Sequence, residues 1–377
     1  MNRPLRPPAR PAARSLQAIS RRHLISAAVA TGVLTASGVP VAARARGGVL
    51  RLGLSGTADG WDMRRARGSF LRVAGQGAVY ETLTEITAGG ELVGELAVAW
   101  EPGDGARTWD VTLRPEVAFH DGRALRAADV LASLAVHRSD SPAAPILARI
   151  AGMRATGPLQ LRFTLTGPDA NFPLALADPH LVIAPEGRFD GIGSGLYRLA
   201  EFTPGERMRL LRVADHWRDG RAGWFDAVVL RAMPEAAIRR AALVAGHVDA
   251  VDQPGPLAGI TARRGLKVVA ASGYGNALGA AEEEAALAAG LAPLPGPPPA
   301  GPVMAVDASW SVTGGAGRAA CYGTGAETLF PGARPFEGAA TAHLPFVTAC
   351  TTRLAHDGLG VIGPLDSGRI AERWWFA

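Results

Sequence analysis

Hydrophobic and polar residues alternate strictly in several short segments of the chain, and this pattern predicts β-strands. In residues 108–114 the side chains of Trp109, Val111 and Leu113 fall on one side and polar side chains fall on the other. Such a segment forms a strand with one buried face. The same reasoning predicts strands at 49–54, 159–165, 196–202 and 207–213, the last two joined as a hairpin through Pro204 and Gly205.

Other segments repeat apolar residues at helical spacing. One helix is predicted over 129–137, and another on a face made of Phe70, Val73, Ala74, Gly77, Ala78 and Leu83. Residues 228–251 predict a strand, a helix and a second strand, with Pro234 in the first helical position and Gly246 ending the helix. Its expected packing face is Ile238, Ala241, Ala242 and Ala245. Strands and helices that alternate in this way indicate a mixed α/β fold.

The first 45 residues have the features of an export leader. Arg21 and Arg22 precede an uncharged run that ends at Ala43, and small polar residues make this run too weakly apolar for a typical membrane span. The pair resembles the twin-arginine signal with which bacteria export folded proteins. The AxA-like end predicts cleavage after Ala45. The alternative is an uncleaved anchor, and in both cases the body of the protein is periplasmic.

The positive charge of the chain belongs to this leader. The formal net charge is +5, and residues 1–45 contain seven arginines and no acid, so the remainder carries 5 − 7 = −2. A mildly acidic body excludes binding to nucleic acid as the main function. Cys321 and Cys350 lack the spacing of a metal site, and the sequence leaves open whether they pair.

Five segments in order between Gly48 and Asp252 resemble one protein family. They are VYETLTEITAGGELVGELAVAWEP, TWDVTLRPEVAFHDGRALRAADV, GSGLYRL, ADHWRDG and the strand–helix–strand unit ending GHVDAVD. Together they resemble the extracytoplasmic solute-binding proteins of ABC importers, in the peptide, dipeptide and nickel branch known as family 5. The closing RIAERWWFA is similar to the end of some members.

The resemblance implies a periplasmic-binding-protein-like α/β clamp of type II. It predicts lobe I in 46–78, 188–255 and 353–377, an inserted subdomain in 79–187, and a second lobe in 256–352. It further implies capture of a short peptide or similar small solute, with nickel complexes as a second ligand class, and delivery to an ABC permease at the inner membrane. We expect a monomer without cofactor or resident metal ion.

The expected second lobe departs from the family. Residues 256–352 are about half the length of that lobe, and 276–301 are of low complexity. The sequence therefore predicts a truncated and poorly ordered second lobe. A deletion or a shifted reading frame would produce such a tract, so a non-binding remnant of the family is the alternative function.

Candidate ligand contacts come from the two places where relatives approach their ligands. Trp61, Asp62, Ser69 and Phe70 surround the loop after the first strand and the start of the next helix. Asp178 and His180 stand in ADPHLVIAP, which resembles a cleft-facing loop. The structural alternatives are a core-covering role for Trp61, a solvated Asp62 and a simple turn at Pro179.

Other polar and aromatic residues have structural explanations. Tyr80 and Trp109 lie on apolar faces and are predicted core residues, His120 and Asp121 fit a turn, and Gly193–Gly195 fits a crossover between lobes better than an anion loop.

We do not expect an enzyme. A secreted hydrolase is a weaker alternative, because no GxSxG-type elbow frames a nucleophile. Its groups would be Cys321, His343, His356 and Asp357.

Overall fold

The computed structural model describes residues 44, 46–56, 62, 69–137, 141–278, 284, 287, 294–295, 303–306, 319–322, 334–335, 342–360 and 363–377. All of the described residues belong to the compact unit Arg44–Ala377. Within the described residues no helix combines the length and the apolar character that a membrane crossing requires.

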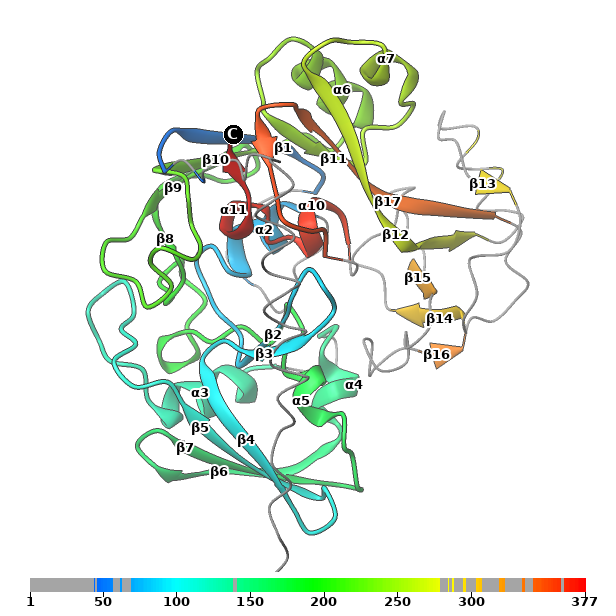
Figure 1. Cartoon of the computed structure of the whole chain (residues 1–377). Helices are drawn as coiled ribbons and strands as arrows, with labels where there is room; N and C mark the ends of the chain where they lie inside the picture. Colours follow the sequence, from blue (N-terminus) through cyan, green and yellow to red (C-terminus); the bar gives the residue numbers. More distant parts are fainter. Residues whose placement is uncertain are drawn as a thin grey trace, which may run out of the picture. The chain divides into compact units, whose positions relative to one another are not determined.

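The largest sheet has eight strands in the order β12-β17-β11-β1-β10-β9-β8, with β13 paired to β17 (Figure 1). Strand β1 runs parallel to both of its neighbours, β10 and β11, whereas the outer pairs are antiparallel. The strands are β1 (Val49–Leu54), β8 (Tyr197–Thr203), β9 (Arg207–Arg212), β10 (Ala227–Ala232), β11 (Ala250–Asp252), β12 (Leu266–Leu278), β13 (Leu294–Pro295) and β17 (Ala342–Thr351).

Strand β1 occupies the middle of this sheet because its side chains are apolar on the face that meets the core. Leu50, Leu52 and Leu54 are fully buried. They belong to one cluster with Phe70, Tyr80 and other apolar residues drawn from segments far apart in the sequence. The hairpin predicted at 196–213 is confirmed as β8 and β9 of the same sheet.

A second, antiparallel sheet has the order β4-β5-β7-β6 (Figure 1). The alternation in β5 is confirmed, since Trp109, Val111 and Leu113 are buried and the residues between them are half-exposed. These side chains pack in their own core with Phe163 and helix α3. The strands are β4 (Ala97–Gly103), β5 (Thr108–Leu113), β6 (Ile150–Gly157) and β7 (Gln160–Leu165), and the helix predicted over 129–137 is α3 (Ala127–Ala135).

The remaining elements are short. The helices are α2 (Ser69–Gly75), α4 (Ala144–Leu147), α5 (Phe172–Ala175), the 3₁₀ turn η2 (Pro185–Gly187), α6 (Ala236–Val244), α7 (Ala258–Thr261), α10 (Pro364–Ser367) and α11 (Ile370–Arg373). The strands are β2 (Thr84–Ile86), β3 (Leu92–Gly94), β14 (Val303–Val306), β15 (Ala319–Tyr322), β16 (Arg334–Pro335), β18 (Leu354–Ala355) and β19 (Trp375–Phe376).

The first predicted helix is shorter than its apolar pattern suggests. Helix α2 ends at Gly75, and Gly77 has a φ of +76°, a left-handed conformation that stops a helix. The following Ala78 and Tyr80 are still buried, because the chain continues through the same core without helical geometry.

Helix α6 starts later than predicted and uses another face. Its N-cap is Glu235, so Pro234 precedes the helix, whereas Gly246 follows its end as expected with a φ of +75°. Ile238 is 49% exposed, and the buried residues include Arg239. The Arg239 guanidinium donates to the backbone carbonyl oxygens of Met233, Pro234, Asp252 and Gln253. These bonds hold the Arg239 side of α6 against the sheet.

Two long strands lie in the range 256–352, where the sequence pattern showed few. Strands β12 and β17 pair with each other, and β17 also pairs with β11. This part of the predicted second lobe therefore extends the sheet that contains β1 (Figure 1). In β17, Cys350 is a buried free thiol whose pKa burial raises to about 11. It forms no disulfide.

The packing of β1 predicts a strong contrast between two substitutions in one strand. Leu52→Ala removes a fully buried side chain and should lower the free energy of unfolding by about 2–5 kcal/mol. Val49→Ala, at a position that is 44% exposed, should change it by less than about 0.5 kcal/mol. Urea unfolding followed by circular dichroism checks this, and equal effects would contradict the central position of β1.

Candidate functional site

The six sequence-predicted ligand contacts do not all remain available for a ligand. Trp61 lies outside the described residues, and Asp62 is described as half-buried. Ser69 and Phe70 form the start of α2, and both side chains are fully buried. Phe70 packs in the main core, which is the role of a structural residue.

Ser69 is held by an aspartate at the end of β11. The Ser69 and Ser55 hydroxyls both donate to Asp252 Oδ2, and the Ser55 amide donates to Oδ1 at 2.9 Å. Arg239 Nε lies 3.3 Å from the same carboxylate, which is 99% buried. These bonds fix the start of α2 against β11, so Ser69 positions the helix.

Asp178 and His180 lie together after helix α5. The His180 amide donates to Asp178 Oδ1 at 2.8 Å, and His180 Nδ1 lies 2.8 Å from the same oxygen. Burial opposes the ionisation of Asp178, but the electrostatic and hydrogen-bond interactions with His180, together with the charge of Arg72, outweigh it and lower the pKa of the carboxyl. The His180 side chain is buried and that of Asp178 remains 26% exposed. Of the two, Asp178 is the one that can meet a solute.

The Gly193–Gly195 stretch crosses closely over residues 78–81. A Cβ on Gly193 would lie 1.9 Å from the Val79 carbonyl oxygen, and one on Gly195 would lie 2.4 Å from that of Ala78. The Gly195 amide donates to Val79, and the Gly193 amide lies 3.4 Å from His120 Nδ1. Because these amides are used within the fold, the stretch is no anion loop.

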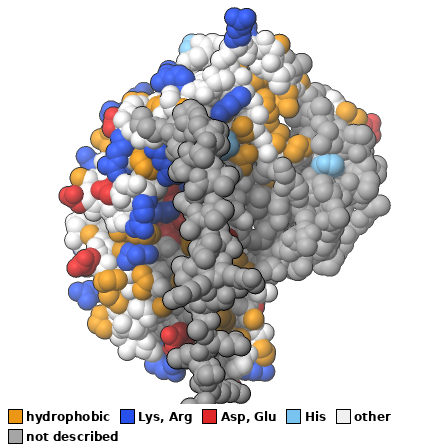
Figure 2. All heavy atoms as spheres, in the orientation of Figure 1, with side chains coloured by type: hydrophobic (Ala, Val, Ile, Leu, Met, Phe, Trp, Pro, Cys, Tyr) orange, Lys and Arg blue, Asp and Glu red, His pale blue; other side chains and the backbone are white. Residues whose placement is uncertain are grey.

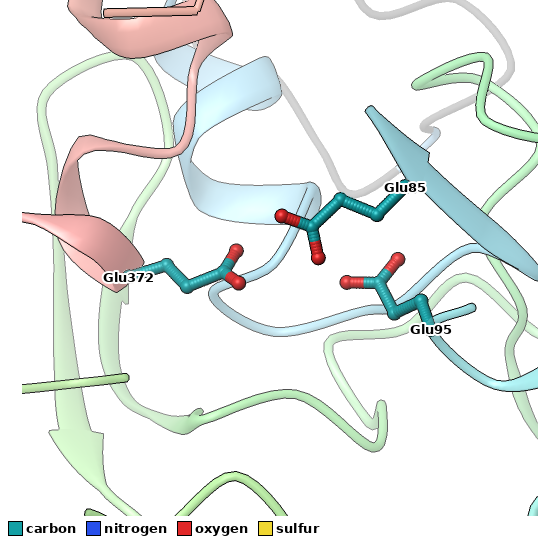
Figure 3. A group of neighbouring side chains, drawn as sticks. All are labelled: Glu85, Glu95 and Glu372. Atoms are coloured by element: carbon teal, nitrogen blue, oxygen red, sulfur yellow. The ribbon is translucent and has the colours of Figure 1, made fainter. Parts of the chain in front are cut away.

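A cluster of buried charged side chains lies next to the place where residues 193–195 cross residues 78–81. We call Glu81, Glu85, Glu95, Arg218, Arg369, Glu372 and Arg373 the junction cluster. Figure 3 shows the carboxylates of Glu85 from β2, Glu95 from the β3–β4 loop and Glu372 from α11 pointing toward one another. Their nearest oxygens lie within 4.8 Å of each other.

Arginines bind these carboxylates. Arg369 Nη1 and Nη2 donate to the two oxygens of Glu95 at 2.7 and 3.0 Å, and Nη1 also donates to Glu372 at 2.7 Å. Arg373 Nη2 donates to Glu85 at 2.7 Å. Arg218 approaches Glu85 at 3.0 Å and also pairs with Glu95 and Glu372. The cluster thereby joins β2, the β3–β4 loop, the segment after β9 and α11.

The short distances between these three carboxylates are typical of a metal site, but their surroundings are not. A bound cation would have to share their oxygens with three guanidinium groups, whose charges already compensate the acids. The junction cluster is therefore a structural ion network.

The pKa values of two acids in the junction cluster are shifted in opposite directions. Burial, together with the negative charge of Glu95, raises the pKa of Glu81 to about 8. Burial would also raise the pKa of Glu85, but the positive charges of Arg369, Arg218 and Arg373 lower it strongly. Glu81 instead accepts from Ser194 Oγ at 2.8 Å and Trp217 Nε1 at 2.9 Å. The Glu81 carboxyl therefore keeps its proton to a higher pH than an ordinary glutamate does.

Of the groups named for a hydrolase, Asp357 and His356 make other contacts in the described part of the chain. Asp357 pairs with Arg44, and the His356 ring stacks on Trp374 with centroids 4.6 Å apart. The side chain of Cys321 lies outside the described residues.

The surface carries no charge pattern typical of nucleic-acid binding over the described residues of the face in view, where basic and acidic side chains are interspersed (Figure 2). A shallow hollow of about 450 Å³ lies beside β5, β6 and β7. It contains Asp110 and Arg162, which bind each other through two hydrogen bonds. The hollow shares no residue with the predicted ligand contacts.

The family follows from comparison with known proteins. Residues 91–280, half of the chain, match the family model described as bacterial extracellular solute-binding proteins, family 5 Middle. The chain belongs to this family. The description of this family names its members as extracellular proteins that bind solutes.

The curated relatives that align with part of the chain include two solute-binding proteins. It is 26% identical over 190 residues to the nickel-binding periplasmic protein of Escherichia coli, covering 46% of this chain and 36% of that protein. It is 28% identical over 250 residues to the glutathione-binding protein GsiB of Pectobacterium atrosepticum, covering 62% and 46%. The chain thus spans less than half the length of these relatives.

Solved structures share the type II binding-protein fold. One is the DppA periplasmic binding protein of Helicobacter pylori in complex with the peptide STSA, with a TM-score of 0.54 and 23% identity over 62% of this chain and 52% of that chain. This confirms the fold predicted from the sequence.

The sequence did not reveal the junction cluster. Its members are spread from Glu81 to Arg373 with no regular spacing. The sequence offers only an indirect indication of this cluster. Acidic residues lie within the apolar segments 79–86 and 92–97, and arginines lie within the closing segment. Such acids are expected to be paired when the segment is buried.

Removing one arginine from the junction cluster should leave buried carboxylates uncompensated. We expect Arg369→Met to lower the free energy of unfolding by about 3–5 kcal/mol. Arg188→Met, at a side chain that is 55% exposed, is the matched control and should cost less than about 0.5 kcal/mol. The double variant Arg369→Met/Glu95→Gln should recover part of the loss. Similar urea midpoints for the two single variants would refute the proposed role of the network.

Glu81 should make stability depend on pH. Its carboxyl titrates near the ordinary 4.5 when unfolded and at about 8 when folded, so the folded chain retains a proton that the unfolded chain has lost. The free energy of unfolding should therefore fall as pH rises between these values. Glu81→Gln should remove this part of the fall, whereas the exposed Glu186→Gln should not. Urea midpoints from about pH 5.5 to about pH 8.5 test this, and parallel curves for all three proteins would count against it.

Proposed function

We propose that this protein is the substrate-binding component of an ABC importer that captures a short peptide or a similar small solute. The observation that carries the proposal is the match of half the chain to family 5, together with the type II fold. A binder of this kind needs a surface that removes water from the solute and positions a few polar groups, without a nucleophile or acid–base pair.

The ligand class is inferred from relatives and from the described site. The relatives named above bind nickel, glutathione and a peptide. The partly exposed Asp178 is held by the His180 amide and ring, and its lowered pKa keeps a negative charge available for an ammonium group. A peptide presents such a group at its amino end, which favours a peptide over a bare metal ion.

The protein acts in the periplasm, exported by its twin-arginine leader, and delivers its solute to an inner-membrane permease. It works as a monomer, and it neither binds nucleic acid nor catalyses a reaction. In this proposal Trp61 and Asp62 form one group of ligand contacts and Asp178 forms the second, while His180 positions the Asp178 carboxylate.

Ligand binding should stabilise the folded protein. A peptide at about 100 times its dissociation constant adds about 2.7 kcal/mol to the free energy of unfolding. We expect at least one fraction of a di- to tetrapeptide library to raise the melting temperature of the exported protein, and Asp178→Asn to abolish most of that rise. Asp121→Asn, which alters an exposed turn acid paired with Arg123, is the control and should respond as the wild type does.

Nickel–histidine complexes form a parallel arm of this experiment. A shift with nickel alone would replace the peptide by a metal complex as the ligand. The absence of a shift with any peptide or nickel complex would favour a non-binding remnant of the family.

A further inference from the structure

The first described residue of the folded unit, Arg44, is tied to distant parts of the chain. Its guanidinium carbon lies 5.3 Å from the ring centroid of Trp224 and 4.9 Å from that of Trp375, and its Nη2 donates to Asp357. The compact unit itself begins at Arg44. A residue with contacts to three separate segments is part of the folded body.

These contacts have a physical reason. Trp224 and Trp375 are 7% and 4% exposed, and a guanidinium close to two aromatic faces gains cation–π attraction while its stem covers apolar surface. Arg46 is held less closely, at 5.9 Å from Trp224 and 4.0 Å from Asp219, with 55% of its side chain exposed against 39% for Arg44. Of the two arginines, Arg44 therefore makes the closer contacts with the folded body, and its loss would remove them.

This bears on where the leader is cut. Leader removal requires short side chains at the first and third positions before the cut. Ala43 and Ala45 satisfy this for a cut after Ala45, and Val41 and Ala43 occupy the same two positions for a cut two residues earlier. The sequence permits both, but only the earlier cut keeps Arg44.

We propose that the leader is removed on the amino side of Arg44, so that Arg44 is the first residue of the mature protein and fastens its amino end to Trp224, Trp375 and Asp357. This replaces the cut after Ala45 expected from the AxA pattern. A twin-arginine leader carries a protein that is already folded, so the contacts of Arg44 exist before the cut is made. The inference shares the assumption of export with the proposed function but does not depend on ligand binding.

Processing of the full-length chain provides the test. The gene with its own leader is expressed in a Gram-negative host that has a twin-arginine translocase, and the periplasmic protein is analysed by intact mass and amino-terminal sequencing. We expect a chain that begins with Arg44, heavier by one arginine and one alanine residue than a chain that begins with Arg46. A chain beginning at any other residue, or an uncut chain, overturns the proposal. Because no ligand is involved, this result is independent of the peptide-binding test.

A pair of variants tests the packing argument. Arg44→Gln keeps a long polar side chain but removes the charge, and it should lower the melting temperature of the exported protein by roughly 2 °C. Arg46→Gln is the matched control and should lower it by less than half as much. Equal shifts for the two variants would overturn the anchoring role of Arg44, and the mass of each variant shows where it has been cut.

Discussion

The fold depends on the compensation of charge inside the junction cluster. Glu85, Glu95 and Glu372 are almost completely buried, and taking a carboxylate out of water costs several kcal/mol unless cations and hydrogen bonds replace the water. Arg369 and Arg218 provide both. Because these residues come from segments at opposite ends of the chain, the network forms only when the segments have met correctly. Breaking it would remove the ion pairs that connect α11 and Arg369 with β2 and the β3–β4 loop.

This constraint explains how a short closing segment supports the remainder of the molecule. Helix α11 has only four residues, yet it brings Glu372 and Arg373 to the cluster, with Arg369 immediately before it. Trp374 beside it is fully buried in the same core as β1. The C-terminal residues therefore complete a scaffold that starts at β1 and includes α2. A rigid support of this kind is what a binding surface requires.

The sequence predicted local structure well where one physical cause acts alone. The alternation of Trp109, Val111 and Leu113 fixed β5, and Gly246 ended α6, because side-chain pattern and backbone freedom decide such features locally.

Long-range contacts decided the features that pattern alone did not give. Helix α2 ends early, at Gly75, Arg239 replaces Ile238 on the buried face of α6, and Ser69 bonds to Asp252. Strands β12 and β17 join the first sheet through pairing between segments about 75 residues apart, which no local pattern reveals. For the same reason, Asp178 was identified as a candidate from a resemblance, while its support by His180 became visible only in the structure.

The central claim is that this scaffold holds a solute and leaves it chemically unchanged. Native mass spectrometry of the protein purified from the periplasm tests this most directly, because it weighs the protein together with whatever it retains. The account predicts a population heavier by one peptide-sized molecule, which denaturation releases intact and which rebinds to the emptied protein. A mass equal to that of the polypeptide alone, unchanged when peptides or nickel complexes are added, would contradict it.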